Sequence, residues 1–276
     1  MKQFRRLLRN TSVSFGAILT LTILAATLIG AFFVGDPLKM NFGHILEGPS
    51  SRFLFGTDDF GRDLVARVTH GTRLSVGIGL AVMAATTIAG TVIGLLAGSF
   101  RRMSFLMRIM DAMMAFPSLL LAIGLMAAMG SNALNVVLAL SIVYTPRMAR
   151  IVESSVLQLR EEVYVEAARA LGVPTVRILF RHILPNGIAP IIVQSTFVFA
   201  FGVLAEAALS FVGIGVQPPA ATLGNILGAA RPMLREAPWL SFIPGAVIFL
   251  LVLGVNMLGD GLRVVMDPKE TEFSNR

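Results

Sequence analysis

The residues of this chain that could do covalent or metal chemistry are few and scattered. There is no cysteine, and the three histidines are His44, His70 and His182. They give little basis for a metal centre, and thiolate ligation is excluded. No Ser-His-Asp arrangement and no catalytic pair of carboxylates can be placed, so we predict that the chain is not an enzyme. We expect neither a bound metal nor a cofactor.

Two sets of acidic residues require an explanation. Glu206 interrupts an apolar run, where an ion or proton relay is conceivable. It follows Pro185 by about 20 residues, or roughly 30 Å of helix, which places it at the outer interface with a structural or mouth-lining role. A second acidic group contains arginines, which favours a solvated folded element or a docking surface for a binding protein over a cation site. Its members are Asp58, Asp59, Arg62, Asp63 and Arg67.

The chain also lacks the means to hydrolyse a nucleotide. No GxxxxGK[ST] loop is present, and none of its three lysines, Lys2, Lys39 and Lys269, follows a glycine. If the chain takes part in a process driven by ATP, the ATP must be used by partner subunits.

The composition is that of an integral membrane protein. Of 276 residues, 55% are hydrophobic and only 14% are charged, and the mean hydropathy is +0.77. A soluble domain has about 25% charged residues. The net charge of +7 invites a nucleic-acid partner, but the Lys and Arg residues cluster at the ends of apolar runs. That distribution is typical of membrane topology, so we expect no nucleic acid to bind.

The apolar runs predict an all-α fold with six transmembrane helices. The first run is about 23 residues long, too long for the hydrophobic part of a signal peptide and sufficient to cross a bilayer. With the N-terminus inside, 16 of the 23 Lys and Arg residues fall on cytoplasmic segments. The chain is therefore predicted to be multi-pass with both termini cytoplasmic. Near the inner interface, Arg108 and Asp111 are expected to pair at i, i+3. The predicted spans are 11–34, 74–100, 112–130, 133–151, 183–211 and 240–262.

The polar segment 161–185 cannot lie in lipid. Eight charged residues fall between Glu153 and Arg181, and at about 3 kcal/mol each their burial in a bilayer would cost roughly 24 kcal/mol. A helix is predicted over 161–170, ended by a left-handed Gly172, and a second helix over 175–184 is started by Pro174. This hairpin either fits a groove of a partner protein or merely connects two spans.

The small residues within the spans and the two external segments give further structural predictions. Gly90, Gly94 and Gly98 follow small-xxx-small spacing, which favours close helix packing within the chain over a dedicated dimer face. Segment 35–73 is balanced in charge and too polar to span. Segment 213–239 is rich in Pro and Gly and is predicted to include a re-entrant or surface-lying piece that caps a cavity.

The polar hairpin resembles the EAA loop in the membrane subunits of ABC importers, whose pattern is EAA-x3-G-x9-I-x-LP. Here EAA occupies 166–168, Gly172 follows after three residues, and LP occupies 184–185. His182 stands where the general pattern has Ile. The surrounding RHILPN resembles the peptide-permease branch.

Four further motifs resemble the same branch, in the same order along residues 53–268. Two departures are Leu223-Gly224, where the family commonly has Trp-Gly, and Val264, where an Asp is common. The first departure means that this external segment does not indicate which substrate is transported. The motifs are FGTDDFGRD at 55–63, RIMDAMMAFP at 108–117, LSFVGIGVQPP at 209–219 and NMLGD at 256–260.

The resemblance implies a C-subunit-type permease of the binding-protein-dependent dipeptide/oligopeptide/nickel uptake family, in the bacterial inner membrane with a type I ABC importer fold. Its partners would be a second homologous permease, two cytoplasmic ATP-binding subunits and an external substrate-binding protein. It divides the chain into 1–73 (tail, first helix and external loop), the permease core 74–268 and the cytoplasmic tail 269–276. The loop residues implied to couple to the ATPases are Glu166, Ala167, Ala168, Arg169, Gly172, Pro174 and Arg177.

Three functions follow from these observations. Import of di- and oligopeptides is favoured, and a nickel or other small-solute permease is the alternative within the family. An ion-coupled secondary transporter is the alternative of another class. It requires essential intramembrane acids, and Glu206 is the only residue in a suitable run.

Overall fold

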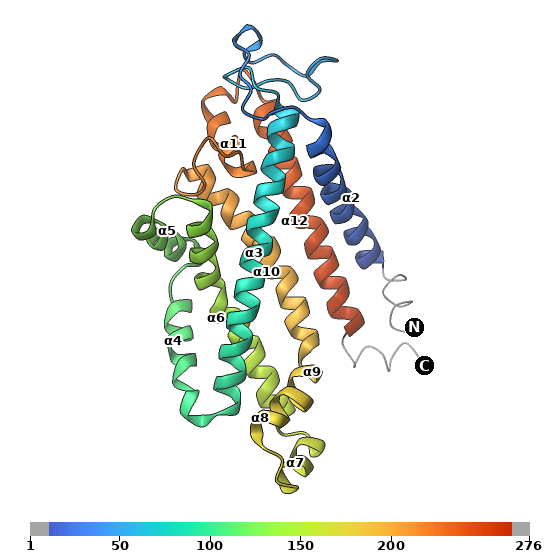
Figure 1. Cartoon of the computed structure of the whole chain (residues 1–276), viewed down its shortest axis with the longest axis vertical. Coiled ribbons are helices and arrows are strands. Elements are labelled where there is room, and N and C mark those ends of the chain that lie inside the picture. The colour runs from blue at the N-terminus through green and yellow to red at the C-terminus, as the bar shows by residue number, and fades with distance from the viewer. Residues whose placement is uncertain (1–10, 267–276) are drawn as a thin grey trace.

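A bundle of long helices dominates the computed structural model, which describes residues 11–266 (Figure 1). Five of these helices are long and apolar enough to cross a membrane. Within the described residues no strand is formed beyond one isolated bridge between Thr57 and Asp63. The predicted tail 269–276 lies outside the described residues. The five helices are α2 (Thr11–Phe33), α3 (Leu64–Ser99), α6 (Ala133–Leu159), α10 (Ile188–Val212) and α12 (Trp239–Met266).

The third predicted span, 112–130, is broken between two helices. α4 (Phe105–Met114) and α5 (Ser118–Met129) meet at a bend of 94° and together are apolar enough for a sixth span. The prediction of one uninterrupted helix over 112–130 is therefore wrong. Pro117 explains the break, because proline lacks an amide hydrogen and disfavours helical geometry in the residue before it.

Two spanning helices extend well past their apolar stretches. α3 begins at Leu64, ten residues before the predicted start, where the Asp63 side chain accepts a hydrogen bond from the Val65 amide. At 36 residues it is about 54 Å long, against about 30 Å of hydrocarbon. α3 is therefore continuous across the predicted boundary at residue 73. α6 likewise continues to Leu159.

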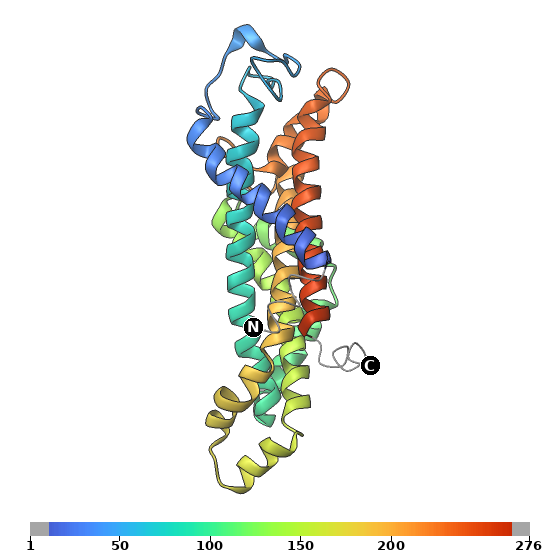
Figure 2. The ribbon, with the colours of Figure 1, turned by 90° about the vertical axis from the view of Figure 1, so that its right-hand side faces the viewer.

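α3 packs chiefly against α6 and α10, while α12 packs against α2 and α10 (Figure 2). Close approach depends on small residues. A Cβ added at Gly94 would lie 2.5 Å from the backbone oxygen of Ala149, and Gly90 and Gly98 face the same helix, α6. The glycine spacing thus serves packing within the chain, as predicted.

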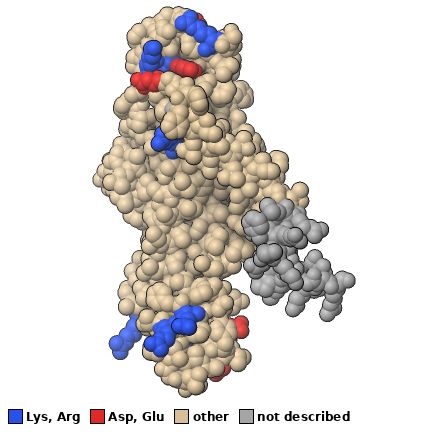
Figure 3. Space-filling view, turned by 45° about the vertical axis from the view of Figure 1, so that its right-hand side comes forward, with Lys and Arg blue, Asp and Glu red and all other residues tan. Residues whose placement is uncertain are grey.

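The charged side chains visible in Figure 3 lie toward the two ends of the molecule, with a broad band free of charge between them. Such a band matches the hydrocarbon part of a bilayer. Gly261 of α12 lies against Val13 of α2, so the described ends of these two helices are on the same side of the bundle.

Asp111 pairs with a residue other than the one predicted. Its carboxylate binds the guanidinium of Arg150 in α6, which also lies 3.9 Å from Glu153. The predicted Arg108–Asp111 pair is therefore wrong. α4 packs directly on α6, and this contact brings Arg150 to the aspartate across the helix pair.

Short helical segments connect the long ones at both ends of the bundle. They are η1 (Phe42–His44), η2 (Arg101–Met103), α7 (Val163–Ala170), α8 (Thr175–Ile178), the π-helical η3 (Leu179–Ile183), α9 (Leu184–Asn186), α11 (Leu223–Ala230) and η4 (Arg231–Met233).

Candidate functional site

The polar hairpin, residues 160–187, projects beyond the long helices at one end of the molecule (Figures 1 and 2). It consists of α7, a tight turn, and the consecutive segments α8, η3 and α9, which lead into α10. The predicted helix–turn–helix is confirmed, although the first helix begins at Val163 and the second is π-helical over Leu179–Ile183.

The turn of the hairpin ends α7 with two characteristic hydrogen bonds. The amide of Gly172 donates to the carbonyl of Arg169 at 2.9 Å, and the amide of Val173 donates to that of Ala168 at 3.1 Å. Gly172 has φ +75°, as predicted for a left-handed residue after a helix. Pro174 is the N-cap of α8, and the second helix begins at Thr175, as predicted.

The inner face of the hairpin is part of the protein core. Val165 is fully buried, and the inward-facing apolar residues join the cluster formed by α3, α6 and α10. At its base, Arg160 Nη1 donates to the carbonyl oxygen of Gly98 at the end of α3, at 3.4 Å. The Asn186 amide donates to the Tyr164 hydroxyl at 3.3 Å and to the carbonyl of His182. The hairpin is therefore a fixed projection.

Its outer face presents apolar and basic side chains. Leu171 is 83% exposed, and Val163, Val176 and Phe180 are also exposed. Arg177 lines an open groove with Pro174, Val176, Phe180 and Arg181. Of the seven residues predicted to couple, six are exposed at this end: Glu166, Ala167, Arg169, Gly172, Pro174 and Arg177.

Ala168 is the exception among the seven. It is buried, with 8% of its surface exposed, and it belongs to the same core cluster as Val165. A small side chain at this position lets α7 lie close to the rest of the hairpin. Its contribution in this chain is to internal packing.

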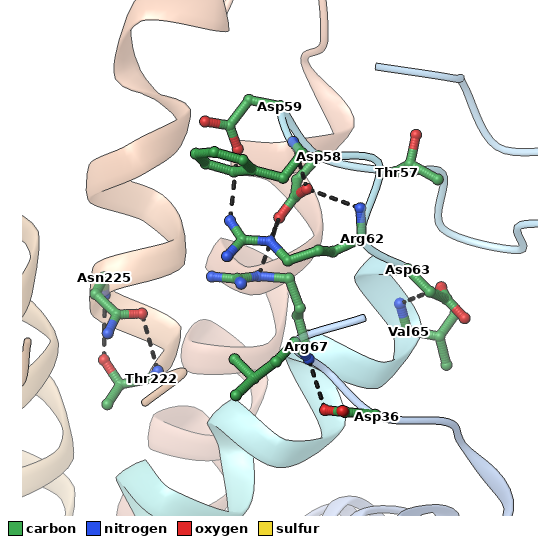
Figure 4. Close-up of polar contacts among 12 residues, drawn as sticks. Asp36, Thr57, Asp58, Asp59, Arg62, Asp63, Val65, Arg67, Thr222 and Asn225 are labelled. Carbon is green, nitrogen blue, oxygen red and sulfur yellow. Dashed lines mark hydrogen bonds and ion pairs between the residues drawn. The ribbon is translucent and has the colours of Figure 1, made fainter. Parts of the chain in front are cut away.

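At the opposite end, the acidic segment before α3 forms a buried cluster around Asp58 (Figure 4). The Asp58 carboxylate accepts from the amides of Phe60 and Arg62, both at 2.9 Å. It also accepts from Arg62 Nε at 2.7 Å and lies 3.3 Å from Arg67 Nε. Burial and the neighbouring Asp58 carboxylate raise the pKa of Asp59.

The predicted folded element is confirmed, but the prediction that it is solvated is wrong, because Asp58 and Arg67 are buried. No group of acidic or histidine side chains suited to a metal occurs in the part of the chain that the structure describes. The carboxylate of Asp58 is neutralised by two arginine guanidinium groups, so no cation is needed there.

The cap segment, residues 213–238, covers this same end. Its helix α11 packs on α10, α12 and α3. Thr222 and Asn225 form a reciprocal cap at its start, with N···O distances of 2.9 and 3.1 Å (Figure 4). A Cβ at Gly224 would lie 2.4 Å from the carbonyl oxygen of Ala207 in α10. The helix therefore rests directly on the α10 backbone, as a capping piece should.

Glu206 lies at the base of this cap and is fully buried. The Ser75 hydroxyl of α3 donates to its Oε2 at 2.7 Å, and the Ser210 hydroxyl donates to its Oε1 at 2.8 Å. The predicted structural role is thus supported, and the mouth-lining alternative is excluded by burial. Sequence reasoning missed Ser75 entirely, whereas Ser210, one helical turn after Glu206, was open to detection.

A cavity of about 500 Å³ opens near the hairpin, between α6, α10 and α12. Its polar lining includes Ser155, Gln158, Asn186, Gln194 and Arg263. It lies at the level where the hairpin joins the long helices. A change in the angle of α10 would therefore alter both the cavity and the hairpin.

The apolar belt, the projecting hairpin and the capped opposite end together define a multi-pass membrane protein of the permease class. The family model described as "Binding-protein-dependent transport system inner membrane component" matches residues 75–272. The chain belongs to this family.

Relatives of known name support the assignment. The dipeptide transport system permease protein DppC of Alkalihalophilus pseudofirmus is 43% identical, over 96% of this chain and 88% of that protein. The di/tripeptide transport system permease protein DppC of Pseudomonas aeruginosa is 45% identical, over 81% and 75%. The glutathione transport system permease protein GsiD of Pectobacterium atrosepticum is 38% identical, over 96% and 90%.

A solved structure shows the same fold. A chain from inward-facing conformations of the MetNI methionine ABC transporter matches with a TM-score of 0.54 at 20% identity. The match covers 69% of this chain and 94% of that chain. The all-helical ABC permease fold predicted from the sequence is thereby confirmed.

Proposed function

We propose that this chain is a permease subunit of an ATP-driven import system for di- and oligopeptides. The proposed substrate class rests on the names of three relatives that are 38–45% identical to this chain. All three are named as permeases for short peptides. No chemical step on the peptide is expected of this chain. The chain provides half of the path that the peptide takes through the membrane. It also changes the side of the membrane to which that path is open.

The hairpin is the point at which we propose that energy enters. Its outer face combines exposed apolar side chains with Arg169 and Arg177, a surface suited to a groove in another protein. Its inner face is continuous with the core. A movement imposed on the hairpin is therefore passed to α6 and α10, the helices it joins.

The proposed assembly contains two permeases, two ATP-binding subunits and an external substrate-binding protein. The hairpin end faces the cytoplasm, as the excess of Lys and Arg on its side supports, and the cap end faces the binding protein. ATP binding draws the two ATPases together, the hairpins follow, and the paired bundles rock so that the path opens outward. Hydrolysis then resets the pair.

Uptake in a host without its own peptide permeases tests this proposal. The chain is expressed with its neighbouring permease, ATPase and binding-protein genes, and accumulation of a labelled dipeptide and tripeptide is measured. The control replaces the phosphate-loop lysine of each ATPase. We expect uptake that requires intact ATPases and survives a protonophore while ATP is maintained.

Each alternative has its own outcome in this assay. Uptake of ⁶³Ni²⁺ without peptide uptake would favour the nickel permease. Peptide uptake that persists without functional ATPases and collapses with the proton gradient would favour an ion-coupled transporter. Either result would refute the proposal.

A further inference from the structure

Glu206 is an acidic residue that the proposed transport cycle does not use. It is fully buried in α10, and among the described residues no Lys, Arg or His side chain forms an ion pair with it. A buried acid is costly unless it is well hydrogen-bonded. Its retention in an otherwise apolar region therefore calls for a role in holding other groups in place.

Backbone donors leave both serine hydroxyls able to donate to Glu206. The Leu223 amide donates to the Ser75 hydroxyl at 3.3 Å, and the Val216 amide donates to the Ser210 hydroxyl at 3.1 Å. An amide can only donate, so each hydroxyl uses one lone pair there and keeps its single hydrogen for the carboxyl group of Glu206. The two serines contact one carboxyl oxygen each.

These bonds join three elements at one side chain. Ser75 lies in α3, Glu206 and Ser210 lie in α10, and the two amides belong to the cap segment. The cap segment is thus tied to the carboxyl group near its start and again at the N-terminus of α11.

Backbone packing around the network is equally close. A Cβ at Gly215 would lie 2.6 Å from the Ser210 amide nitrogen, and a Cβ at Gly71 would lie 3.2 Å from the Thr222 carbonyl carbon. With so little free space, a change in the hydrogen bonds of Glu206 cannot be absorbed by local rearrangement.

We propose that Glu206 is a positioning residue that holds the cap segment to α3 and α10, so that the cap and these two helices move as one body in transport. The carboxyl group acts through two serines and never contacts the transported solute. The inference about the cap stands on the contacts alone. Its consequence for uptake rests on the proposed function.

Hydrogen–deuterium exchange of the assembled transporter in lipid nanodiscs tests the proposal. Glu206→Gln keeps the size of the side chain but replaces one acceptor by a donor. We expect amide exchange in segment 213–230 to rise about 5-fold to 100-fold, the range for leaving a buried hydrogen-bonding group without its partner. Exchange in the polar hairpin should be unchanged.

Variants of each serine test separately the contact of Ser75 with the start of α11 and the contact of Ser210 with Val216. They remain informative if the Glu206→Gln transporter fails to assemble. Ser75→Ala should speed exchange mainly at the start of α11, and Ser210→Ala mainly around Val216. Thr72→Val is the matched control, because Thr72 is buried in α3 one turn away and donates to the Val68 carbonyl within its own helix. It should leave exchange in the cap unchanged.

A functional readout distinguishes positioning from simple stability. In Glu206→Gln we expect peptide uptake to fall several-fold more than ATP hydrolysis, because the cap no longer follows the helices. The proposal would be overturned if amide exchange in the cap segment of Glu206→Gln were as slow as in the wild type. It would also be overturned if Thr72→Val raised exchange in the cap segment as much as Glu206→Gln does. Absence of peptide uptake by the wild type would instead refute the proposed function and leave the exchange result standing.

Discussion

Replacing Gly172 by alanine tests whether the hairpin turn must keep its left-handed geometry. Gly172 has φ +75°, and nothing lies within 4 Å of an added Cβ. The substitution therefore introduces backbone strain without a steric clash inside the chain. An L-residue in this conformation costs about 1–2 kcal/mol, which lowers the relative population of the native turn by a factor of about 5 to 30.

The series Gly172→Asn, Gly172→Ala and Gly172→Val separates strain from a clash with a partner. Asparagine tolerates positive φ better than alanine although it is larger, and valine tolerates it least. If strain controls docking, retention of the ATPases should fall in the order Gly, Asn, Ala, Val. Gly77→Ala is the control, because Gly77 lies in α3 with open space around it and alanine favours a helix.

The assay is co-purification of the ATP-binding subunits with the tagged permease, followed by peptide uptake per ATP hydrolysed. Membrane insertion is checked by the yield of permease, which should not change across the series. The reasoning would be refuted if the valine variant assembled and transported normally. It would also fail if asparagine were worse than alanine, because that order follows side-chain volume.

Three further predictions concern packing and the Asp58 cluster. Gly94→Val should prevent close packing of α3 on α6 and lower the yield of folded protein, measured by monodisperse recovery in detergent. Asp58→Asn leaves Arg62 and Arg67 without their shared carboxylate and should reduce stability by about 3–5 kcal/mol, measured as a fall in Tm. Burial raises the pKa of Asp59 in the folded protein above its pKa in the unfolded chain. The stability that this group contributes is therefore lost as pH rises from the unfolded-state pKa through the folded-state pKa. Asp59→Asn should therefore flatten the dependence of Tm on pH above the ordinary pKa of an aspartate, and an unchanged slope would contradict the assignment.

Local signals were enough to predict the hairpin. Gly172 and Pro174 mark a helix end and a helix start by their own conformational preferences, and the structure places the turn between them. The outer limits of α3 were not predictable in this way. Arg67 looks too polar for a spanning helix until Asp58, nine residues earlier, is seen to pair with it.

The errors have specific physical causes. The break at Pro117 was visible in the sequence, but an average of hydropathy over 112–130 does not register a single proline. The inward orientation of Ala168, one of the predicted coupling residues, is visible only in the folded hairpin, and its coupling role stays a prediction. Ser75 and Glu206 are separated by 131 positions, and no local pattern links residues so far apart.

The length of α3 has a mechanical consequence. Ser75 lies on this helix beneath the cap, and Gly98, 23 residues later, accepts the hydrogen bond from Arg160 at the base of the hairpin. The two positions are about 35 Å apart on one uninterrupted helix. A tilt of about 5° about either point displaces the other by about 3 Å, several times the extra separation of less than about 1 Å that breaks a hydrogen bond. A rigid helix of this length therefore converts a small rotation at one end of the bundle into a large displacement at the other.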